Sequence, residues 1–562
     1  MAVSSSLKAA SATAAYSKDE PLELKTLLVK YLKIYCQRST VHGVKYIFDK
    51  DLNKLERLFW ILIVMAAIVF SVATFFVLLF NYNEQIVLTV IDDSHYPVFN
   101  IHFPAVAVCT HERINWNKFD EARDLFLPPD SPNETKVIFR EFVQRMAMLR
   151  FGGFSQFNNT DDIPLEKIDF VNVTELALFL SFECEELFDG DCLWQQGNKF
   201  NCCEIFVMEK SEVGFCWVFN SLVSAESKQK VKNDKSYPWR GFKSGENSGL
   251  NFRLKLNATS SFGQPIHRDG IDLMIKKSTQ WTDVVYSIKG NTDSLVVIRP
   301  ELKTTDPATR EIPPEVRGCM FDSETDHYLY KNIKGLRYSQ WNCFNVCHEE
   351  HLLSICNCTI SIFFPQNDSY RECSPSDFSC LYNFREVFSY DKRLDEEKYI
   401  NNIKSGMLCP CLIRCDSAVQ YFVTISSLPT METVPNDTRI MSIDVHYQTD
   451  SLIKYRAIRE FTFMEMVASL GGIVGLLLGA SILSGIEIIY HLTLGLVIFL
   501  KDNYFFSRMW IRFKNNLKMN TQQNQISPKN NHNYPKQVWH DYPNRRRRKN
   551  HHHQQQQQHQ RY

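Results

Sequence analysis

The amino-acid sequence predicts a two-pass membrane protein in which two transmembrane helices flank a large, disulfide-rich α+β extracellular domain. Three observations predict it: two long runs without charged residues, a difference in net charge between the segments they separate, and the placement of 16 of the 17 cysteines in the central segment. The 44% hydrophobic and 22% charged residues exclude a wholly disordered chain. The net charge of zero gives no sign of a nucleic-acid partner.

Each uncharged run is long enough to cross a bilayer. Residues 58–80 are 23 residues without a charged side chain. A helix of that length spans roughly 35 Å, which exceeds the hydrocarbon core of about 30 Å. Residues 466–486 form the second run, and residues 488–500 extend it beyond Glu487. We therefore predict transmembrane helices at residues 58–80 and 461–500.

The segments outside these runs differ in charge. Residues 1–57 carry ten Lys and Arg against six Asp and Glu, and residues 501–562 carry thirteen against two. Residues 81–460 carry 40 against 53. Positively charged flanks remain in the cytoplasm, so we predict a multi-pass protein of the plasma membrane with both termini cytoplasmic. No cleavable signal peptide is expected, because the first apolar run is too long and starts too late.

Glycosylation sequons support the same topology. Seven N-x-S/T sequons occur, and all lie within residues 81–460. Such sequons mark surface positions of secreted segments. Asn357 is the least favourable acceptor, because it lies between Cys356 and Cys358. The glycosylation candidates are therefore Asn133, Asn158, Asn172, Asn257, Asn367 and Asn436.

The cysteines of the central segment predict a disulfide framework, because their number is even and the segment is extracellular. The C-x-C spacing of Cys409 and Cys411 could bind a metal in a reducing compartment, but outside the cell disulfides are favoured. No metal and no cofactor are predicted. The disulfide candidates are Cys109, Cys184, Cys192, Cys202, Cys203, Cys216, Cys319, Cys343, Cys347, Cys356, Cys358, Cys373, Cys380, Cys409, Cys411 and Cys415.

Local patterns indicate the elements of each segment. A helix is predicted to start near residues 19–21, with an apolar face that suits either the inner membrane surface or a small cytosolic packing contact. A second helix is predicted at residues 135–151 from its apolar spacing. Residues 501–562 form a basic, Gln- and His-rich tail that is predicted to be disordered. Strands are predicted at residues 250–256, 295–298, 419–425 and 440–447.

Sequence motifs of enzymes are missing. His348 and His351 are three residues apart, whereas a zinc-protease helix needs histidines four apart. The chain has no Walker loop, no G-x-S-x-G elbow and no Rossmann fingerprint. We therefore predict that the protein is not an enzyme and that its function lies in the membrane.

The second span is rich in small residues. Gly471, Gly475 and Gly479 recur every four residues, and Ala468 lies one turn earlier. Small residues at this period let helix backbones approach closely, and a packing seam alone would explain them. Glu487, an ionisable group within the span, is costly there unless it faces water or a partner. Closely packed helices with exposed carbonyls and hydroxyls can instead form a narrow cation pore.

At the level of short motifs, the chain resembles the degenerin/epithelial sodium channel family, and most closely its insect pickpocket branch. The resemblance covers residues 40–500. Each motif is weak alone, but their order, with two spans and a cysteine-rich insert, is highly specific. The motifs are His42-Gly43, F-P-A-V-A-V-C at residues 103–109, G-F-C-W-V-F-N at 214–220, R-G-C at 317–319, W-N-C-F-N-V-C at 341–347, C-N-C at 356–358, C-P-C-L-I-R-C at 409–415 and G-G-I-V-G-L-L-L-G-A-S at 471–481.

The resemblance implies roles for individual residues. Gly479, Ala480 and Ser481 would form the selectivity filter. His42 and Gly43 would belong to the gating segment, and Ala468 would stand where bulky substitutions hold degenerins open. The resemblance and the seam together assign Gly471, Gly472, Gly475 and Glu487 to the pore and its helix packing.

The chain departs from the family pattern at two places. Ser469 stands where many relatives have an acid, so the outer mouth would lose a ring of charges. Pro313-Pro314-Glu315 lacks the tryptophan of the acid-sensing relatives.

The predicted function is that of a pore-forming subunit of a trimeric, amiloride-sensitive, sodium-selective channel. Its partners would be sodium ions, like or related subunits, the lipid bilayer and amiloride as a blocker, with no nucleic acid. The alternative is a non-conducting accessory subunit, or a two-pass glycoprotein receptor, that needs a partner subunit to form a pore.

Overall fold

The computed structural model describes residues 24–84, 86–158, 163–257, 269–392, 405–431 and 438–502. The chain forms two compact units. The first, here called the membrane unit, lies within Met1–Phe75 and Ser469–Tyr562, and the second, named the extracellular unit after its predicted location, comprises Phe76–Ala468. The predicted tail lies outside the described residues except for its first two, as does the predicted helix start near residues 19–21.

Two helices are long and apolar enough to cross a membrane, Lys54–Glu84 with 31 residues and Ile482–Asp502 with 21. Only 11% and 6% of their most apolar stretches are buried, so neither is the core helix of a soluble domain. The predicted first span lies inside the first of these helices. The helices of this part of the chain are α1 (Leu24–Arg38), α2 (Val44–Ile47), α3 (Lys54–Glu84), α14 (Phe463–Leu478) and α15 (Ile482–Tyr490), followed by a π-helical turn (His491–Gly495).

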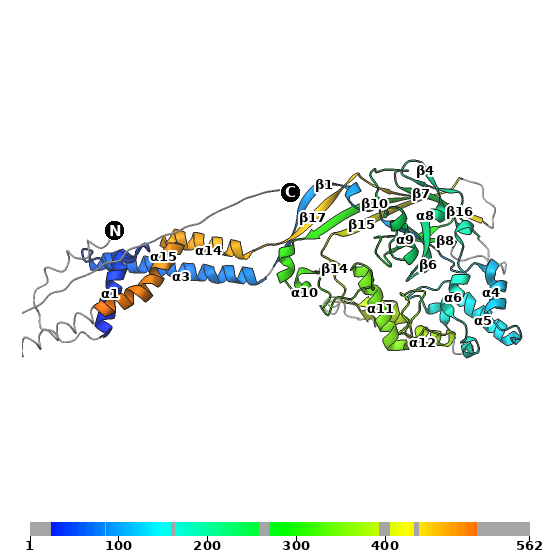
Figure 1. Ribbon diagram of the computed structural model, residues 1–562, viewed down its shortest axis with the longest axis horizontal. Coiled ribbons are helices and arrows are strands. Elements are labelled where there is room, and N and C mark those ends of the chain that lie inside the picture. The colour runs from blue at the N-terminus through cyan, green and yellow to red at the C-terminus, as the bar shows by residue number, and fades with distance from the viewer. Residues whose placement is uncertain are drawn as a thin grey trace, which may run out of the picture. The chain divides into compact units, whose positions relative to one another are not determined.

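An eight-stranded sheet runs along the upper side of the extracellular unit in Figure 1. Its order is β1-β17-β10-β16-β7-β3-β4, and β15 pairs with β10 outside this path. The first strand is antiparallel to the last, with Val87 opposite Arg459. The four predicted strands are confirmed as parts of β7, β10, β15 and β16. The bounds are β1 Val87–Pro97, β3 Asp191–Trp194, β4 Asn198–Asn201, β7 Leu250–Asn257, β10 Thr292–Thr305, β15 Ala418–Pro429, β16 Thr438–Tyr447 and β17 Ser451–Arg459.

A second sheet of five strands has the order β5-β6-β2-β8-β9. The F-P-A-V-A-V-C motif places β2 in its middle, where all six residues of the strand are buried. Alternating apolar residues of both sheets share one core, which includes Val106, Phe219, Leu273 and Val445. The bounds are β2 Ala105–Thr110, β5 Phe206–Ser211, β6 Gly214–Phe219, β8 Gly270–Lys276 and β9 Val285–Lys289.

A second core is enclosed by helices α4, α5, α6, α11, α12 and α13, whose bounds are given below, whereas α7 and α8 pack on the core of the two sheets. Phe139, Phe142, Phe154 and Phe378 are fully buried in the second core. The helix predicted at 135–151 is confirmed as α5, which starts two residues earlier and ends at Met146. The bounds are α4 Phe119–Phe126, α5 Asn133–Met146, α6 Val173–Phe179, α7 Cys184–Leu187, α8 Cys202–Ile205, α9 Ala225–Asn233, α10 Pro314–Arg317, α11 Gln340–Cys356, α12 Phe378–Asn383 and α13 Arg385–Phe388, with two-residue strands β11 Cys319–Met320, β12 Asp391–Lys392, β13 Met407–Leu408 and β14 Ile413–Arg414.

All sixteen cysteines between the two spans are paired, which confirms the disulfide framework. Two of the bonds tie successive turns of α11 to the C-x-C segment, so that Cys409 and Cys411 have no free thiolate for a metal. Cys36 is the free cysteine of the described chain. The pairs are Cys109–Cys216, Cys184–Cys203, Cys192–Cys202, Cys319–Cys415, Cys343–Cys411, Cys347–Cys409, Cys356–Cys380 and Cys358–Cys373.

Four of the six glycosylation candidates have exposed side chains in the extracellular unit. The side chain of Asn257 and all of Asn436 lie outside the described residues. Asn357, the least favourable sequon, ends α11 in the left-handed conformation with φ 54°. The exposed candidates are Asn133, Asn158, Asn172 and Asn367.

Candidate functional site

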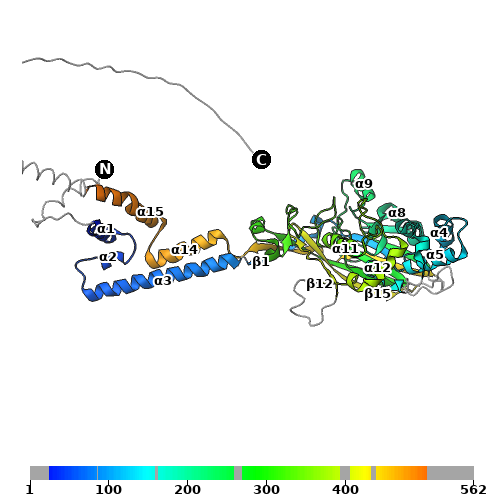
Figure 2. The ribbon, with the colours of Figure 1, turned by 90° about the horizontal axis from the view of Figure 1, so that it is seen from below.

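The second span is interrupted where the filter was predicted. Helix α14 ends at Leu478, the chain is non-helical over residues 479–481, and α15 begins at Ile482 (Figure 2). A helix end leaves its last carbonyls without partners in the helix. Non-helical backbone at membrane depth occurs only where protein covers it or water reaches it. The break therefore exposes backbone oxygens to a partner or to an ion.

The segment around His42 lies against this break. The backbone N–H of His42 donates a 2.8 Å hydrogen bond to the carbonyl of Leu478, the last residue of α14. Gly479 has a left-handed φ of 58°, and a Cβ there would stand 2.2 Å from Nδ1 of His42. Glycine is thus required at 479 both by its backbone and by the ring that covers it. Two residues predicted to gate and to select are in direct contact.

Glycine is also required at position 43. Gly43 has a φ of 84°, and a Cβ there would stand 2.5 Å from Cγ2 of Val64 on α3. Immediately after it, α2 packs beside α3, where Tyr46 stacks on Trp60 with ring centroids 4.6 Å apart (Figure 2). The close approach of the His-Gly segment to the first span therefore depends on the missing side chain.

Ser481 has a structural role in addition to the predicted one. It is the N-cap of α15, and its side-chain oxygen accepts a hydrogen bond from the N–H of Ser484 at 3.3 Å. Ser484 in turn accepts from the N–H of Ser481 at 3.2 Å, which completes a capping box. Such a cap contributes about 1 kcal/mol to a helix start. The Ser481 hydroxyl, predicted to contact ions, therefore also stabilises the start of α15.

Glu487 has a partner that the sequence analysis missed. The hydroxyl of Thr40 donates to its carboxylate at 2.6 Å and lies 3.2 Å from the hydroxyl of Ser484. A hydrogen bond to a charged group is stronger than one between neutral groups. This contact accounts for an acid within an apolar span and fixes the segment that carries His42 to α15. No local pattern of the sequence signals this contact, because the two residues are 447 positions apart.

The seam residues Gly471 and Gly472 on α14 have no close neighbours in the described chain outside their own helix. Around Gly471 and Gly472, no atom of the described residues lies within 4 Å of the position of a Cβ, apart from the helix itself. A Cβ on Gly475 would meet only the carbonyl oxygen of Ala480, at 3.8 Å. Ala468 is exposed on the same helix. The structure brings Gly479 and Ser481 together with His42 and Glu487, and it leaves the seam residues as an open surface of α14.

A second contact joins the N-terminal helix to the end of the span. The hydroxyl of Tyr31 on α1 donates to the carbonyl oxygen of His491 at 2.9 Å and lies 3.2 Å from its Nδ1. A Cβ at Gly495 would stand 2.4 Å from the same hydroxyl. The π-helical turn that begins at His491 is therefore covered by α1.

His348, rejected above as a zinc ligand, forms a buried ion cluster in the extracellular unit. Its Nδ1 lies 2.9 Å from Glu212 and its Nε2 lies 2.8 Å from Asp391. Burial lowers the pKa of His348, but the two carboxylates outweigh burial and raise it to about 10. The cluster thus carries a permanently charged imidazolium near neutral pH.

A sequence profile described as "Amiloride-sensitive sodium channel" matches residues 35–491. The chain is 31% identical over 472 residues to Pickpocket protein 19 of Drosophila melanogaster, covering 83% of this chain and 91% of that protein. It is 24% identical over 483 residues to Sodium channel protein Nach of Drosophila ananassae, covering 84% and 87%. It is 22% identical over 513 residues to Bile acid-sensitive ion channel of Mus musculus, covering 85% and 90%.

The matched region includes the whole first membrane helix, the extracellular unit and the second membrane helix as far as residue 491. It also includes the His42 segment and the break at residues 479–481, so the contacts described above lie within the matched region. Members of this family are ion channels that form oligomers and pass sodium, and block by amiloride is a family property. The chain therefore belongs to the amiloride-sensitive sodium channel family and is not an enzyme.

Proposed function

We propose that this chain is a pore-forming subunit of a trimeric, sodium-selective and amiloride-blocked channel of the plasma membrane, with both termini in the cytoplasm and the ion constriction at residues 479–481. The single observation that carries the proposal is the break in the second span, with the His42 segment seated on it. Neither feature is needed by a helix that only anchors a receptor.

The electrostatics of the break suit a cation. The C-terminal end of a helix carries a partial negative charge of about half an elementary charge, and α14 ends at the break with its last carbonyls. The free N–H groups at the start of α15 would repel a cation. In the capping box, however, the N–H groups of Ser481 and Ser484 each donate to the hydroxyl of the other serine. Carbonyl oxygens can therefore replace part of the water shell of sodium.

The open seam supports assembly from several subunits. Gly471, Gly472 and Gly475 allow helix backbones to approach closely, and the energy of association in a membrane comes from such packing. Because no described residue of the same chain covers Gly471 or Gly472, their partners would be the same helices of neighbouring subunits.

The deciding experiment measures current from cells that express this chain alone and together with related subunits. An amiloride-blocked sodium current from the chain alone supports the proposal. Current that appears only with a partner, and whose reversal potential is unaffected by substitutions here, supports the alternative of an accessory subunit. Surface expression is measured in each case, so that missing current is not confused with missing protein.

Ser481 provides the test of the filter itself. Ser481→Ala removes one hydroxyl and little volume, and the expected result is an altered sodium-to-potassium permeability ratio. Because Ser481 also caps α15, Ser481→Asp keeps a capping oxygen and serves as the matched variant. A ratio that is unchanged by both variants would place the filter elsewhere.

A further inference from the structure

The extracellular unit contains a cavity of about 470 Å³ between its two sheets and the start of α11. Its walls include four aromatic side chains, Tyr286, Trp341, Tyr421 and Tyr455. Pockets for small molecules commonly have this size and combine apolar walls with a few polar groups. The cavity therefore has the dimensions and the walls of a ligand site.

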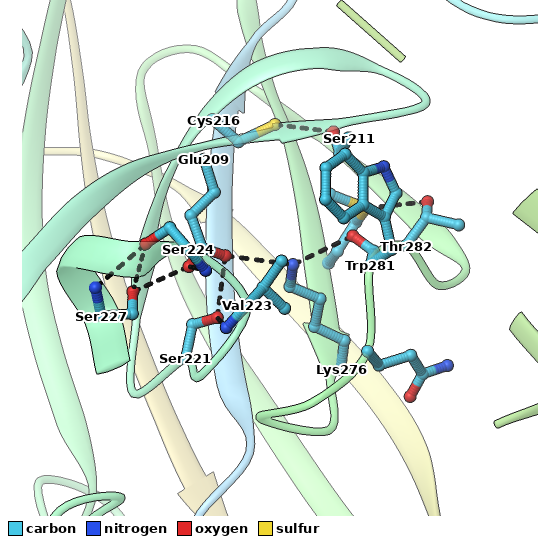
Figure 3. A network of polar contacts seen from close by, with 12 residues as sticks. Glu209, Ser211, Cys216, Ser221, Val223, Ser224, Ser227, Lys276, Trp281 and Thr282 are labelled. Carbon is cyan, nitrogen blue, oxygen red and sulfur yellow. Dashed lines mark hydrogen bonds and ion pairs between the residues drawn. The ribbon is translucent and has the colours of Figure 1, made fainter. Parts of the chain in front are cut away.

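Two consecutive lysines, Lys276 and Lys277, lie beside this cavity and differ in whether their ammonium groups have partners within the protein. Lys276, the last residue of β8, is fully buried; its Nζ donates to the carbonyl of Trp281 at 3.0 Å and lies 3.6 Å from Glu209. The carboxylate of Glu209 also accepts hydrogen bonds from a group of serines (Figure 3). This network is complete and leaves no group for a ligand.

Lys277 has the opposite situation. Successive side chains of an extended chain point to opposite sides. Lys276 therefore points into the buried network, whereas Lys277 lines the cavity. Its ammonium has no hydrogen-bond or ion-pair partner among residues 24–502 where these are described. Burial, together with the nearby Arg414, lowers the pKa of Lys277 to about 8. Arg414 binds Asp322 at 2.7 Å through Nη2, while its buried Nε has no partner in the described chain.

An acid lines the same cavity on the other side of the turn. Asp283 accepts a hydrogen bond from the N–H of Val284 at 2.7 Å. Burial raises the pKa of Asp283 to about 6, and the nearby lysines only partly oppose this. No direct ion pair joins Asp283 to Lys277 among the described residues, although the charge of each shifts the pKa of the other. The side chain of Gln280 also donates a hydrogen bond to Asp283. The cavity therefore contains a positive and a negative group whose charges are only partly compensated.

We propose that this cavity binds a small zwitterion of the amino-acid class with an aromatic or large apolar side chain. Lys277 and Nε of Arg414 receive the ligand's carboxylate, Asp283 receives its ammonium, and the aromatic walls receive its side chain. A ligand with both charges completes the compensation of both groups at once, whereas an ion of one sign leaves the other group only partly compensated. The proposal is independent of the pore, because the cavity lies within the extracellular unit.

The test measures binding to the full-length protein in lipid nanodiscs by calorimetry at pH 7.4, with three probes of similar shape. L-phenylalanine carries both charges, 2-phenylethylamine only the positive one, and 3-phenylpropionate only the negative one. The expected result is saturable binding of L-phenylalanine, at least tenfold tighter than that of either single-charge probe. Absence of saturable binding, or equal binding of L-phenylalanine and a single-charge probe, would overturn the proposal.

Variants assign the two charges. Lys277→Met should weaken the binding of L-phenylalanine at least tenfold and leave the affinity for 2-phenylethylamine unchanged. Asp283→Asn should weaken the binding of L-phenylalanine and leave the affinity for 3-phenylpropionate unchanged. Lys289→Met, an exposed lysine of β9 outside the cavity, is the matched control and should change nothing. If Lys277→Met does not yield folded protein by size exclusion, Asp283→Asn and the three probes still decide. An unchanged affinity in the folded Lys277 or Asp283 variant would refute the assignment.

Discussion

Replacing Gly479 with alanine tests whether the His42 segment is seated on the break in the second span. The added Cβ would lie 2.2 Å from Nδ1 and 2.3 Å from Cε1 of His42, whereas non-bonded atoms prefer about 3.5–4.0 Å. The ring must therefore retreat by more than about 1 Å. That retreat loosens the 2.8 Å hydrogen bond from His42 to Leu478.

Two terms set the size of the effect. The left-handed backbone costs alanine about 1–2 kcal/mol, and the lost hydrogen bond adds about 0.5–1.5 kcal/mol. The backbone cost applies whether or not the segment is seated. The lost hydrogen bond alone, about 1 kcal/mol, lowers the ratio of seated to unseated segments roughly fivefold. Gly485→Ala on α15 is the matched control, because Gly485 is not part of the seam and no described residue outside its own helix lies within 4 Å of its Cβ position.

The assay is a double-mutant cycle on the melting temperature of the detergent-solubilised protein. Gly479→Ala should lower the melting temperature, and it should lower it less in a His42→Ala background, because the clash is gone and only the backbone cost remains. In open channels the same variant should shift the sodium-to-potassium permeability ratio. Equal losses in both backgrounds, or a Gly479→Ala protein as stable as Gly485→Ala, would refute the seating of His42 on the break.

The remaining predictions concern four other sites. Thr40→Val should reduce sodium selectivity by releasing Glu487, with a loss of about 1 kcal/mol in the stability of the seated state. The control is Thr74→Val, because among the described residues the hydroxyl of Thr74 binds only the carbonyl of Phe70. Equal reversal potentials for the two variants would contradict this prediction. Ala468→Val should give a constitutive, amiloride-blocked current by crowding the closed seam, and normal surface expression with unchanged current would count against it. His348→Asn should lower the melting temperature near pH 6, where the imidazolium contributes fully, and this difference should shrink as the pH rises through the folded pKa of about 10; a constant difference would exclude the charge as its cause. Endoglycosidase treatment should lower the apparent mass of the protein, and an unchanged mass would contradict the predicted orientation.

Features that depend on one segment of the chain could be predicted from the sequence. The first span is visible as an uncharged run because its length and apolarity are local properties. The helix α5 and the strands β7, β10, β15 and β16 are visible for the same reason, since their apolar residues recur at the period of the element. Their ends were less accurate: β10 extends beyond residues 295–298 to Thr292–Thr305, because pairing with three neighbours continues past the apolar core.

Features that join distant segments could not be predicted in this way. The uncharged run of the second span continues through residues 479–481, so hydropathy gives no sign of the break. The sequence carried one unused signal, since Ser481 and Ser484 stand three residues apart, as in a capping box. The bond between Thr40 and Glu487 joins residues 447 positions apart, and the eight disulfide pairs are one of very many connectivities that sixteen cysteines allow.

The pairing of the first strand with the last has a consequence for synthesis. Val87 of β1 can pair with Arg459 of β17 only after β17 has been synthesised. Strand β1 therefore stays unpaired until nearly the whole extracellular segment has been translocated. An unpaired edge attracts other chains, and such late closure exposes a nascent protein to aggregation. The second span follows β17 at once, so closure of the sheet and membrane insertion of α14 fall at the same moment of translation. Shortened chains that end before β17 should therefore be retained by chaperones of the secretory pathway rather than reach the cell surface.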